Sequence, residues 1–393
     1  MDFEFSPEVE AFREEVRAFF REEMAPERVA RHSDPRDLTG FDEAFERGLV
    51  GRAGERGYLG VGAPVEYGGS GLSPAFQAVF GFEAAYHDAP CVDTAMTLAG
   101  APMLAFGSPA QKQHWLPRMI GGELFFCIGY TEAEAGSDLS RIAMRARCDG
   151  DAYRLDGTKT LVTGAHKADA MLLIARSDPD TSVRRGSSLF VVDLCVAGIA
   201  IERRPTMNGW TLCDVHFEDV RVPSDALLGE ENRGWQQMAA ALVAERSQLF
   251  HVGWATRDLD DLTAWCRAPD PAGRRLADDP NVRRTLARLR VEVGTALRFA
   301  KRVVHLQASG SELGAEPAIA KLYATELLQR IAAEGMRILG PAGGLVRGSR
   351  RAPLDGRMAW ASIERIHPTI SVGSSEVQRT AIAQQGLGMP RGH

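Results

Sequence analysis

Three short segments of the sequence carry hydroxyls and glycines suited to holding a polar ligand. Residues 130–138 place Tyr, Thr and Ser hydroxyls around a glycine, and residues 159–165 place two threonines after an Asp-Gly pair. Residues 373–379 open with a glycine and two serines and continue in a helix-compatible pattern. Such loops can turn hydroxyls and free amides toward the polar edge of a flat cofactor, and a helix N-terminus favours an anionic group. Each segment alone is also compatible with an ordinary polar loop.

The composition excludes several classes of protein. The 393 residues suggest two or three domains, and 45% hydrophobic with 25% charged residues is typical of a globular chain. This excludes a disordered, collagen-like or coiled-coil protein. The 46 basic and 52 acidic residues give a formal net charge of −6, so we expect no nucleic-acid binding.

The motifs that the sequence lacks narrow the chemistry further. The six cysteines form no C-x-x-C pair and the nine histidines form no H-E-x-x-H pattern, so we expect neither a disulfide framework nor a metal site. No Rossmann fingerprint, phosphate-binding P-loop or G-x-S-x-G elbow is present. The acidic N-terminus lacks a signal core and no apolar run reaches about 18 residues, which favours a cytoplasmic protein with no membrane span.

The elements that must position these segments change type twice along the chain. Ser6 before Pro7 predicts a helix start, and Ser108 with Gln111 predicts a capping box that opens another helix. From residue 123 the pattern is short and β-rich, with hairpin turns predicted at residues 149–150 and 156–157.

Helical patterns return after residue 234. They cover residues 235–265, 280–310 and 315–339, and a last helix is predicted to start near Ser374. We therefore predict an α+β fold of three domains. These are an N-terminal helical domain (1–122), a middle β-barrel-like domain (123–232) and a C-terminal four-helix bundle (233–393).

Taken together and in this order, the segments resemble the acyl-CoA dehydrogenase family. The family tail is close to E-G-T-[SN]-E-I-Q-R, which residues 373–379 resemble. The family's first loop is close to T-E-P-x-A-G-S-D, which residues 131–138 resemble. The resemblance spans the chain and also covers residues 66–71, 219–223, 229–235 and 385–390. Residues 276–280, 338–341 and 352–356 are similar to an actinobacterial branch acting on steroid side chains or other bulky acyl-CoAs.

The resemblance implies an FAD-dependent enzyme that converts an acyl thioester, on CoA or an acyl carrier protein, into its 2,3-enoyl form. In the family a carboxylate takes the α-proton and flavin N5 accepts the β-hydrogen as hydride. An electron-transfer flavoprotein then accepts the electrons. The positions that match the family's flavin and thioester contacts are Ile128, Tyr130, Thr131, Gly136, Ser137, Leu161, Thr163, Ser374 and Glu376.

The resemblance implies two further positions and a second role for Ser137. Ser137 matches a position at the thioester end of the substrate, and Arg246 matches one near the CoA moiety. The family's R-x-x-F-G-x-P motif reaches FAD in a neighbouring subunit; it is not intact here, and Arg267 is the candidate for its arginine. Leu161 also departs from the family, which usually has an aromatic residue against the isoalloxazine ring.

The catalytic base requires a choice between two family solutions. Many members use the glutamate that opens E-G-T, but Val372 stands there and Ser371 precedes it. Isovaleryl-type and long-chain-type members place the glutamate before an arginine in the first helix of the C-terminal domain, which Glu245 and Arg246 match. Glu245 could also be an ordinary solvated helix carboxylate. The missing tail carboxylate leads us to predict Glu245 as the base.

Two other functions stay open at this point. Some relatives are flavin monooxygenases, and the altered arginine motif with Leu161 also allows a catalytically silent subunit. Family assemblies indicate a homotetramer or homodimer, or pairing with a different chain, and the identity of the acyl group stays open.

Overall fold

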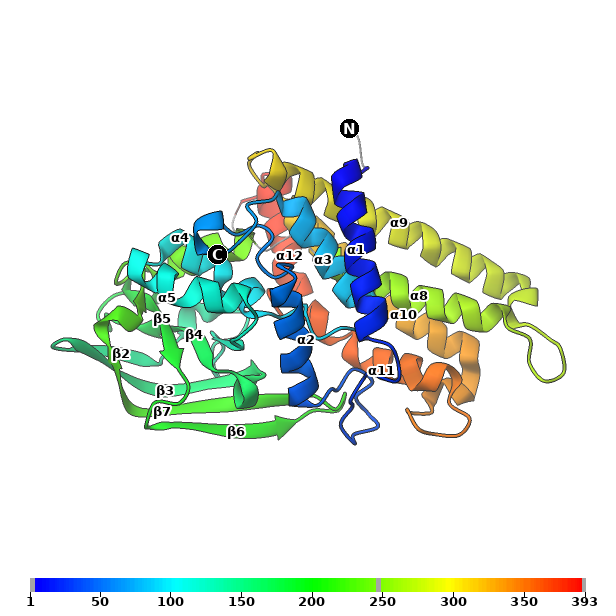
Figure 1. Ribbon diagram of the computed structural model, residues 1–393, viewed down its shortest axis with the longest axis horizontal. Coiled ribbons are helices and arrows are strands. Elements are labelled where there is room, and N and C mark those ends of the chain that lie inside the picture. Colours follow the sequence, from blue (N-terminus) through cyan, green and yellow to red (C-terminus); the bar gives the residue numbers. More distant parts are fainter. Residues whose placement is uncertain (1–3, 245–248, 391–393) are drawn as a thin grey trace.

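The computed structural model describes residues 4–244 and 249–390. Helices come first, a sheet follows, and a second set of helices completes the chain (Figure 1). This confirms the predicted α+β class and its order. Within the described residues, no helix is both long and apolar enough to cross a membrane.

The N-terminal part holds five α-helices whose ends follow the capping signals of the sequence. Ser6 accepts a hydrogen bond from the Val9 amide, and Ser108 and Gln111 form the predicted capping box. Both serines therefore satisfy amides that a helix start leaves free. The helices are α1 (Pro7–Glu23), α2 (Glu43–Glu55), α3 (Pro74–Tyr86), α4 (Ala101–Phe106) and α5 (Pro109–Ile120).

The middle part is an eight-stranded sheet with the order β6-β7-β3-β2-β4-β5-β8, and β1 pairs with β4. This path of pairing is open between β6 and β8, so the described strands form a sheet rather than a closed barrel. A short helix, α6 (Val183–Gly186), precedes β5. The strands are β1 (Phe126–Gly129), β2 (Arg145–Asp149), β3 (Ala152–Thr163), β4 (Ala170–Arg176), β5 (Ser187–Asp193), β6 (Ile199–Pro205), β7 (Thr211–Pro223) and β8 (Leu227–Leu228).

One of the two predicted hairpin turns is wrong. The turn at residues 149–150 joins β2 to β3, with Gly150 at φ +66°. Residues 156–157 instead lie inside β3, where the register against β7 shifts. Gly157 has φ +140° there, and a Cβ would lie 2.9 Å from Met144 Cα. The Asp-Gly pair therefore marks an irregularity within a strand, not a chain reversal.

The C-terminal part is helical and shares its largest core with α3. Fully buried Val252, Leu259, Leu289 and Leu327 belong to this core. The last α-helix begins at Ser375 with Ser374 as its N-cap, as predicted. The helices are α7 (Gly234–Ala244), α8 (Leu249–Arg267), α9 (Pro280–Ala308), α10 (Glu316–Leu339), α11 (Arg357–Glu364) and α12 (Ser375–Ala381).

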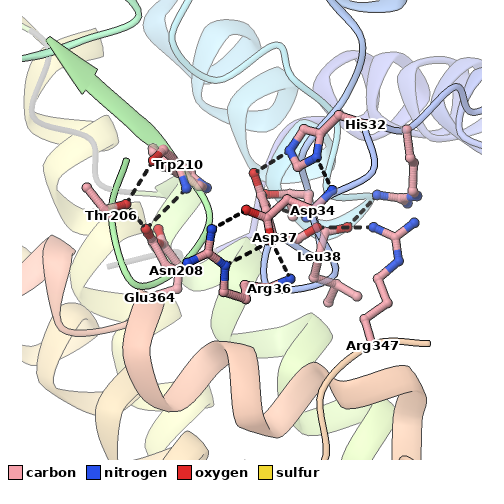
Figure 2. A network of polar contacts seen from close by, with 12 residues as sticks. His32, Asp34, Arg36, Asp37, Leu38, Thr206, Asn208, Trp210, Arg347 and Glu364 are labelled. Carbon is pink, nitrogen blue, oxygen red and sulfur yellow. Dashed lines mark hydrogen bonds and ion pairs between the residues drawn. The ribbon is translucent and has the colours of Figure 1, made fainter. Parts of the chain in front are cut away.

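A polar network ties the three parts together at the turn between β6 and β7 (Figure 2). The Asn208 amide donates to the buried Glu364 carboxylate at the end of α11. Gly209 lies against Asp37 of the N-terminal part so closely that a Cβ would sit 2.4 Å from Asp37 Cβ. Arg347 donates to the Asp37 carbonyl at 3.1 Å. The network therefore fixes the end of the sheet against the C-terminal helices.

Candidate active site

The loop after β1 is tied to β3, which brings two of the predicted cofactor segments together. The Thr160 amide donates to the Thr131 carbonyl at 2.9 Å, and the Lys159 ammonium donates to the Tyr130 carbonyl at 3.4 Å. Ile128 lies just before this loop, in β1, opposite Leu172 of β4. We call the surface formed by residues 128–137 and 161–163 the sheet wall.

A buried ion pair stands behind the sheet wall. Lys159 is fully buried, and its ammonium lies 2.7 Å from a carboxylate oxygen of Glu132. The same carboxylate accepts hydrogen bonds from the Ala143 and Met144 amides at 2.7 and 3.1 Å. Burial lowers the pKa of Lys159 to about 8, while the Glu132 charge opposes this shift. The sequence analysis missed this pair, because nothing in its charge pattern marks either residue as buried.

The rest of the loop presents Gly136 and Ser137 at the surface. Glu132 and Ala135 exchange two backbone hydrogen bonds of 3.0 Å, which close a tight turn before these two residues. Both are exposed, and a Cβ added at Gly136 would meet nothing within 4 Å. The loop therefore leaves open space beside a hydroxyl and a glycine.

Leu161 and Thr163 form the other edge of the sheet wall. Leu161 has φ +54°, and 56% of its surface is exposed. Its amide lies 3.4 Å from an Asp214 carboxylate oxygen, and the Thr160 hydroxyl donates to the same oxygen. A left-handed backbone is unusual for a branched side chain, and such strain is concentrated at functional sites. The exposed apolar side chain offers a surface for a flat ring but no aromatic stacking.

The segment before α12 forms a second wall, residues 371–374, which we call the tail turn. Val372 and Gly373 follow one another with φ +52° and +86°, and Val372 is 62% exposed. The Ser374 hydroxyl accepts from the Val377 amide at 3.4 Å, and Glu376 is exposed on the first turn of α12. A cavity of about 600 Å³ borders this helix and is lined in part by Ser375, Glu376 and Arg379.

An aromatic contact connects the neighbourhood of the sheet wall to the segment that precedes the tail turn. Thr163 pairs with Leu212 in β7, two residues after Trp210. The Trp210 ring lies 6.0 Å from the His367 ring, centroid to centroid. The His367 carbonyl in turn accepts hydrogen bonds from the Ile370 and Ser371 amides at 2.9 and 3.0 Å. The end of β3 that carries Thr163 is therefore close to the segment that leads into the tail turn.

Three predicted residues are not brought to these walls by the described structure. Arg267 is exposed at the last position of α8, a helix that runs away from the sheet (Figure 1). Glu245 and Arg246 lie outside the described residues, between α7 and α8. Burial lowers the pKa of His251 in the first turn of α8, and the charge of Lys321, whose ammonium contacts the Gly373 carbonyl of the tail turn, adds to this shift.

The residues present fit FAD. Exposed hydroxyls of Ser137 and Thr163 and exposed apolar Leu161 suit a ring system with a polar edge. At the start of α12, next to the tail turn, the buried Ser375 hydroxyl has no partner among the described residues, so a polar ligand beside it would satisfy a donor. Residues 4–244 and 249–390 contain no group of three or more His, Cys, Asp or Glu side chains that could hold a metal ion.

Comparison with known proteins agrees with this geometry. The three domain models of acyl-CoA dehydrogenase match residues 6–123 (N-terminal), 127–220 (middle) and 232–387 (C-terminal). Acyl-CoA dehydrogenase FadE29 of Mycobacterium tuberculosis is 32% identical over 396 residues, covering 100% of this chain and 99% of that protein. FadE26 of the same organism is also 32% identical, with the same shares covered.

Solved structures extend the similarity to three dimensions. The Tcur3481-Tcur3483 steroid ACAD matches with a TM-score of 0.90 and 31% identity, and all of both chains is covered. The ChsE4-ChsE5 complex of Mycobacterium tuberculosis matches with a TM-score of 0.87 and 30% identity, again with full coverage of both chains. The resemblance seen in the sequence is confirmed: the chain belongs to the acyl-CoA dehydrogenase family and is a flavin-dependent oxidoreductase with acyl-CoA dehydrogenase activity.

Proposed function

We propose that this enzyme removes one hydrogen from each of the α- and β-carbons of a bulky acyl-CoA, with Glu245 as the base for the α-proton. The observation that carries the proposal is the tail turn itself. It follows the segment that contacts the sheet through the Trp210 and His367 rings, and it exposes Val372 at the position where many family members have the glutamate base. A hydrocarbon side chain cannot take a proton.

FAD is the cofactor that the family uses, and bound FAD supplies the acceptor for the β-hydrogen. Thr131, Ser137 and Thr163 would hold the ring end from the sheet wall, with Ile128, Tyr130, Gly136 and Leu161 shaping the surface around it. Ser374 and Glu376 would hold the ribose and phosphates at the start of α12. Arg267 would reach the cofactor of a neighbouring subunit, which is consistent with its exposure at the last position of α8.

The base would come from the helical part of the chain. Glu245 precedes α8, and His251 in the first turn of that helix lies within electrostatic reach of Lys321, which contacts the tail turn. A carboxylate in a pocket sealed by substrate would be desolvated, which raises its pKa toward that of the α-proton it must accept. Arg246, the next residue, would bind the CoA moiety, and Ser137 would lie at the thioester.

Similarity supports a bulky acyl group and an assembly of two kinds of subunit. The Tcur3481-Tcur3483 protein is described as a steroid ACAD, and ChsE4-ChsE5 is a complex of two proteins. We propose a steroid-side-chain or similarly bulky acyl-CoA as substrate and an electron-transfer flavoprotein as electron acceptor. The chain would function as a homotetramer or homodimer, or paired with a related second chain.

The test is anaerobic reduction of the purified flavoprotein. We expect a yellow protein whose oxidised flavin bands bleach with a steroid-side-chain acyl-CoA faster than with straight-chain acyl-CoAs or acyl-carrier-protein thioesters. Turnover would be followed with an artificial electron acceptor. Bleaching by none of these thioesters, with flavin bound, would contradict the proposed reaction. Light scattering of the chain purified alone and co-expressed with a related subunit would decide the assembly.

A further inference from the structure

A buried lysine donates a hydrogen bond to the backbone of the tail turn. Lys321 lies on α10 with 3% of its surface exposed, and its ammonium donates to the Gly373 carbonyl at 2.7 Å. No carboxylate of the described residues lies within ion-pair distance of it. The charged and titratable groups that act on it are Glu376 of α12, His251 of α8 and His367. Desolvation lowers the pKa of Lys321 to about 8.

The tail turn needs such a support. Gly373 and Val372 both have left-handed backbones, and for a β-branched residue this conformation is strained. The Gln378 side chain donates to the Gly373 carbonyl at 3.1 Å and lies 3.4 Å from the Val372 carbonyl. Two side chains from two helices therefore converge on the Gly373 carbonyl oxygen.

The direction of this carbonyl sets the direction of the next amide. In a trans peptide the C=O and N–H groups point to opposite sides. Because the Gly373 carbonyl points at Lys321, the Ser374 N–H points away from α10. No hydrogen bond from the Ser374 amide to a described residue is found, so this donor is available to a ligand.

We propose that Lys321 is a positioning residue of this enzyme, which fixes the tail turn through the Gly373 carbonyl and so aims Ser374 at the cofactor. This rests on the proposed function in one respect, the assignment of Ser374 to FAD. The buried ammonium is suited to the task, because hydrogen bonds from charged donors are stronger than neutral ones. Lys321 touches neither substrate nor the reacting atoms and acts only through the turn.

The central experiment compares Lys321→Met with a matched lysine. Lys301 on α9 is half-buried, and its ammonium contacts Glu4 and the Phe5 ring instead of the tail turn. We expect Lys321→Met to weaken FAD binding to the apoprotein about tenfold, equal to ~1.4 kcal/mol. Lys301→Met should change it less than about twofold. Hydrogen–deuterium exchange over residues 369–379 should accelerate in Lys321→Met alone.

The charge of Lys321 gives a further readout. The ammonium deprotonates as pH rises through about 8, which weakens its bond to the Gly373 carbonyl. FAD affinity of the wild type should therefore fall above pH 8, and that fall should be smaller in Lys321→Met. Burial lowers the pKa values of His251 and His367, and hydrogen bonds lower that of Glu376, so none of the three changes its charge near pH 8.

The outcomes separate this inference from the proposed function. Wild-type FAD affinity and unchanged exchange in Lys321→Met would overturn the role of Lys321, whatever the substrate proves to be. Faster exchange with weaker FAD binding would support it even if no acyl-CoA reduces the wild-type flavin. If Lys321→Met does not fold, Gln378→Met removes the other donor to the same carbonyl; unchanged exchange over residues 369–379 would then overturn the role of this contact.

Discussion

The two walls of the candidate site are each backed by a buried lysine, but the two lysines are compensated differently. Lys159, behind the sheet wall, donates to the Tyr130 carbonyl and forms an ion pair of 2.7 Å with Glu132. Lys321, behind the tail turn, donates to the Gly373 carbonyl at 2.7 Å and has no ion-pair partner in the part of the chain that the structure describes. Burial lowers the pKa of both to about 8.

The difference separates a structural support from an adjustable one. Glu132 is itself held by two backbone amides, so Lys159 cannot lose its charge without leaving a buried carboxylate uncompensated. When Lys321 loses its charge, only the Gly373 carbonyl loses a charged donor, and Gln378 still donates to that carbonyl. Mutation of Lys159 behind the sheet wall should therefore change the free energy of unfolding. Mutation of Lys321 behind the tail turn should mainly change the affinity for the cofactor.

The largest expected effect comes from removing the lysine behind the sheet wall. Lys159→Met should lower the free energy of unfolding by about 3–5 kcal/mol, because it leaves the buried Glu132 charge unpaired. Urea unfolding measures this loss. The double variant Lys159→Met with Glu132→Gln is the control, and it should regain more than half of the stability. A single-variant loss below about 1 kcal/mol would show that the pair is not a structural support.

Glu364 extends the comparison to a buried carboxylate that has a neutral partner. Burial raises its pKa to about 7, while Asn208 is its hydrogen-bond donor. A carboxyl whose pKa is raised on folding contributes stability at low pH that is lost as pH rises toward 7. Glu364→Gln removes this loss, so it should stabilise the protein by up to about 3 kcal/mol at pH 8 and by under about 1 at pH 5. Urea unfolding at both pH values checks this, and equal effects at the two would contradict it.

The smallest expected effect comes from a substitution at Val372 in the tail turn. If Val372 only fills space beside the thioester, Val372→Ala should leave turnover within about tenfold, a change of ~1.4 kcal/mol in the barrier. Steady-state assays of protein with confirmed flavin content measure it. A loss of several orders of magnitude would mean that the tail position takes part in the chemistry.

The sequence was sufficient for the features that depend on local patterns. Capping residues such as Ser6 and Ser108 act within one helical turn, so the helix starts they predict are confirmed. The hairpin turn predicted at residues 156–157 was wrong because an Asp-Gly pair suits both a turn and an irregularity within a strand. Pairing with β7 decides between the two, and the local sequence does not show that pairing.

The supports of the site depend on contacts between distant parts of the chain. Lys159 meets Glu132 across 27 residues and Lys321 meets Gly373 across 52, so no local pattern marks either lysine as buried. The segments proposed to face the cofactor could be singled out through their hydroxyls and glycines. Arg267 could not be placed from one chain, because the role proposed for it requires a neighbouring subunit.

The most direct test of the account is flavin reduction by Glu245→Gln. Glutamine keeps the size and helix propensity of glutamate but cannot accept the α-proton. With an acyl-CoA that bleaches the wild type, stopped-flow absorbance should show a folded, yellow variant whose flavin is reduced at least ~100-fold more slowly. Glu218→Gln, which changes an exposed glutamate of β7, should reduce at the wild-type rate. Reduction of the Glu245→Gln flavin at the wild-type rate would contradict the assignment of the base.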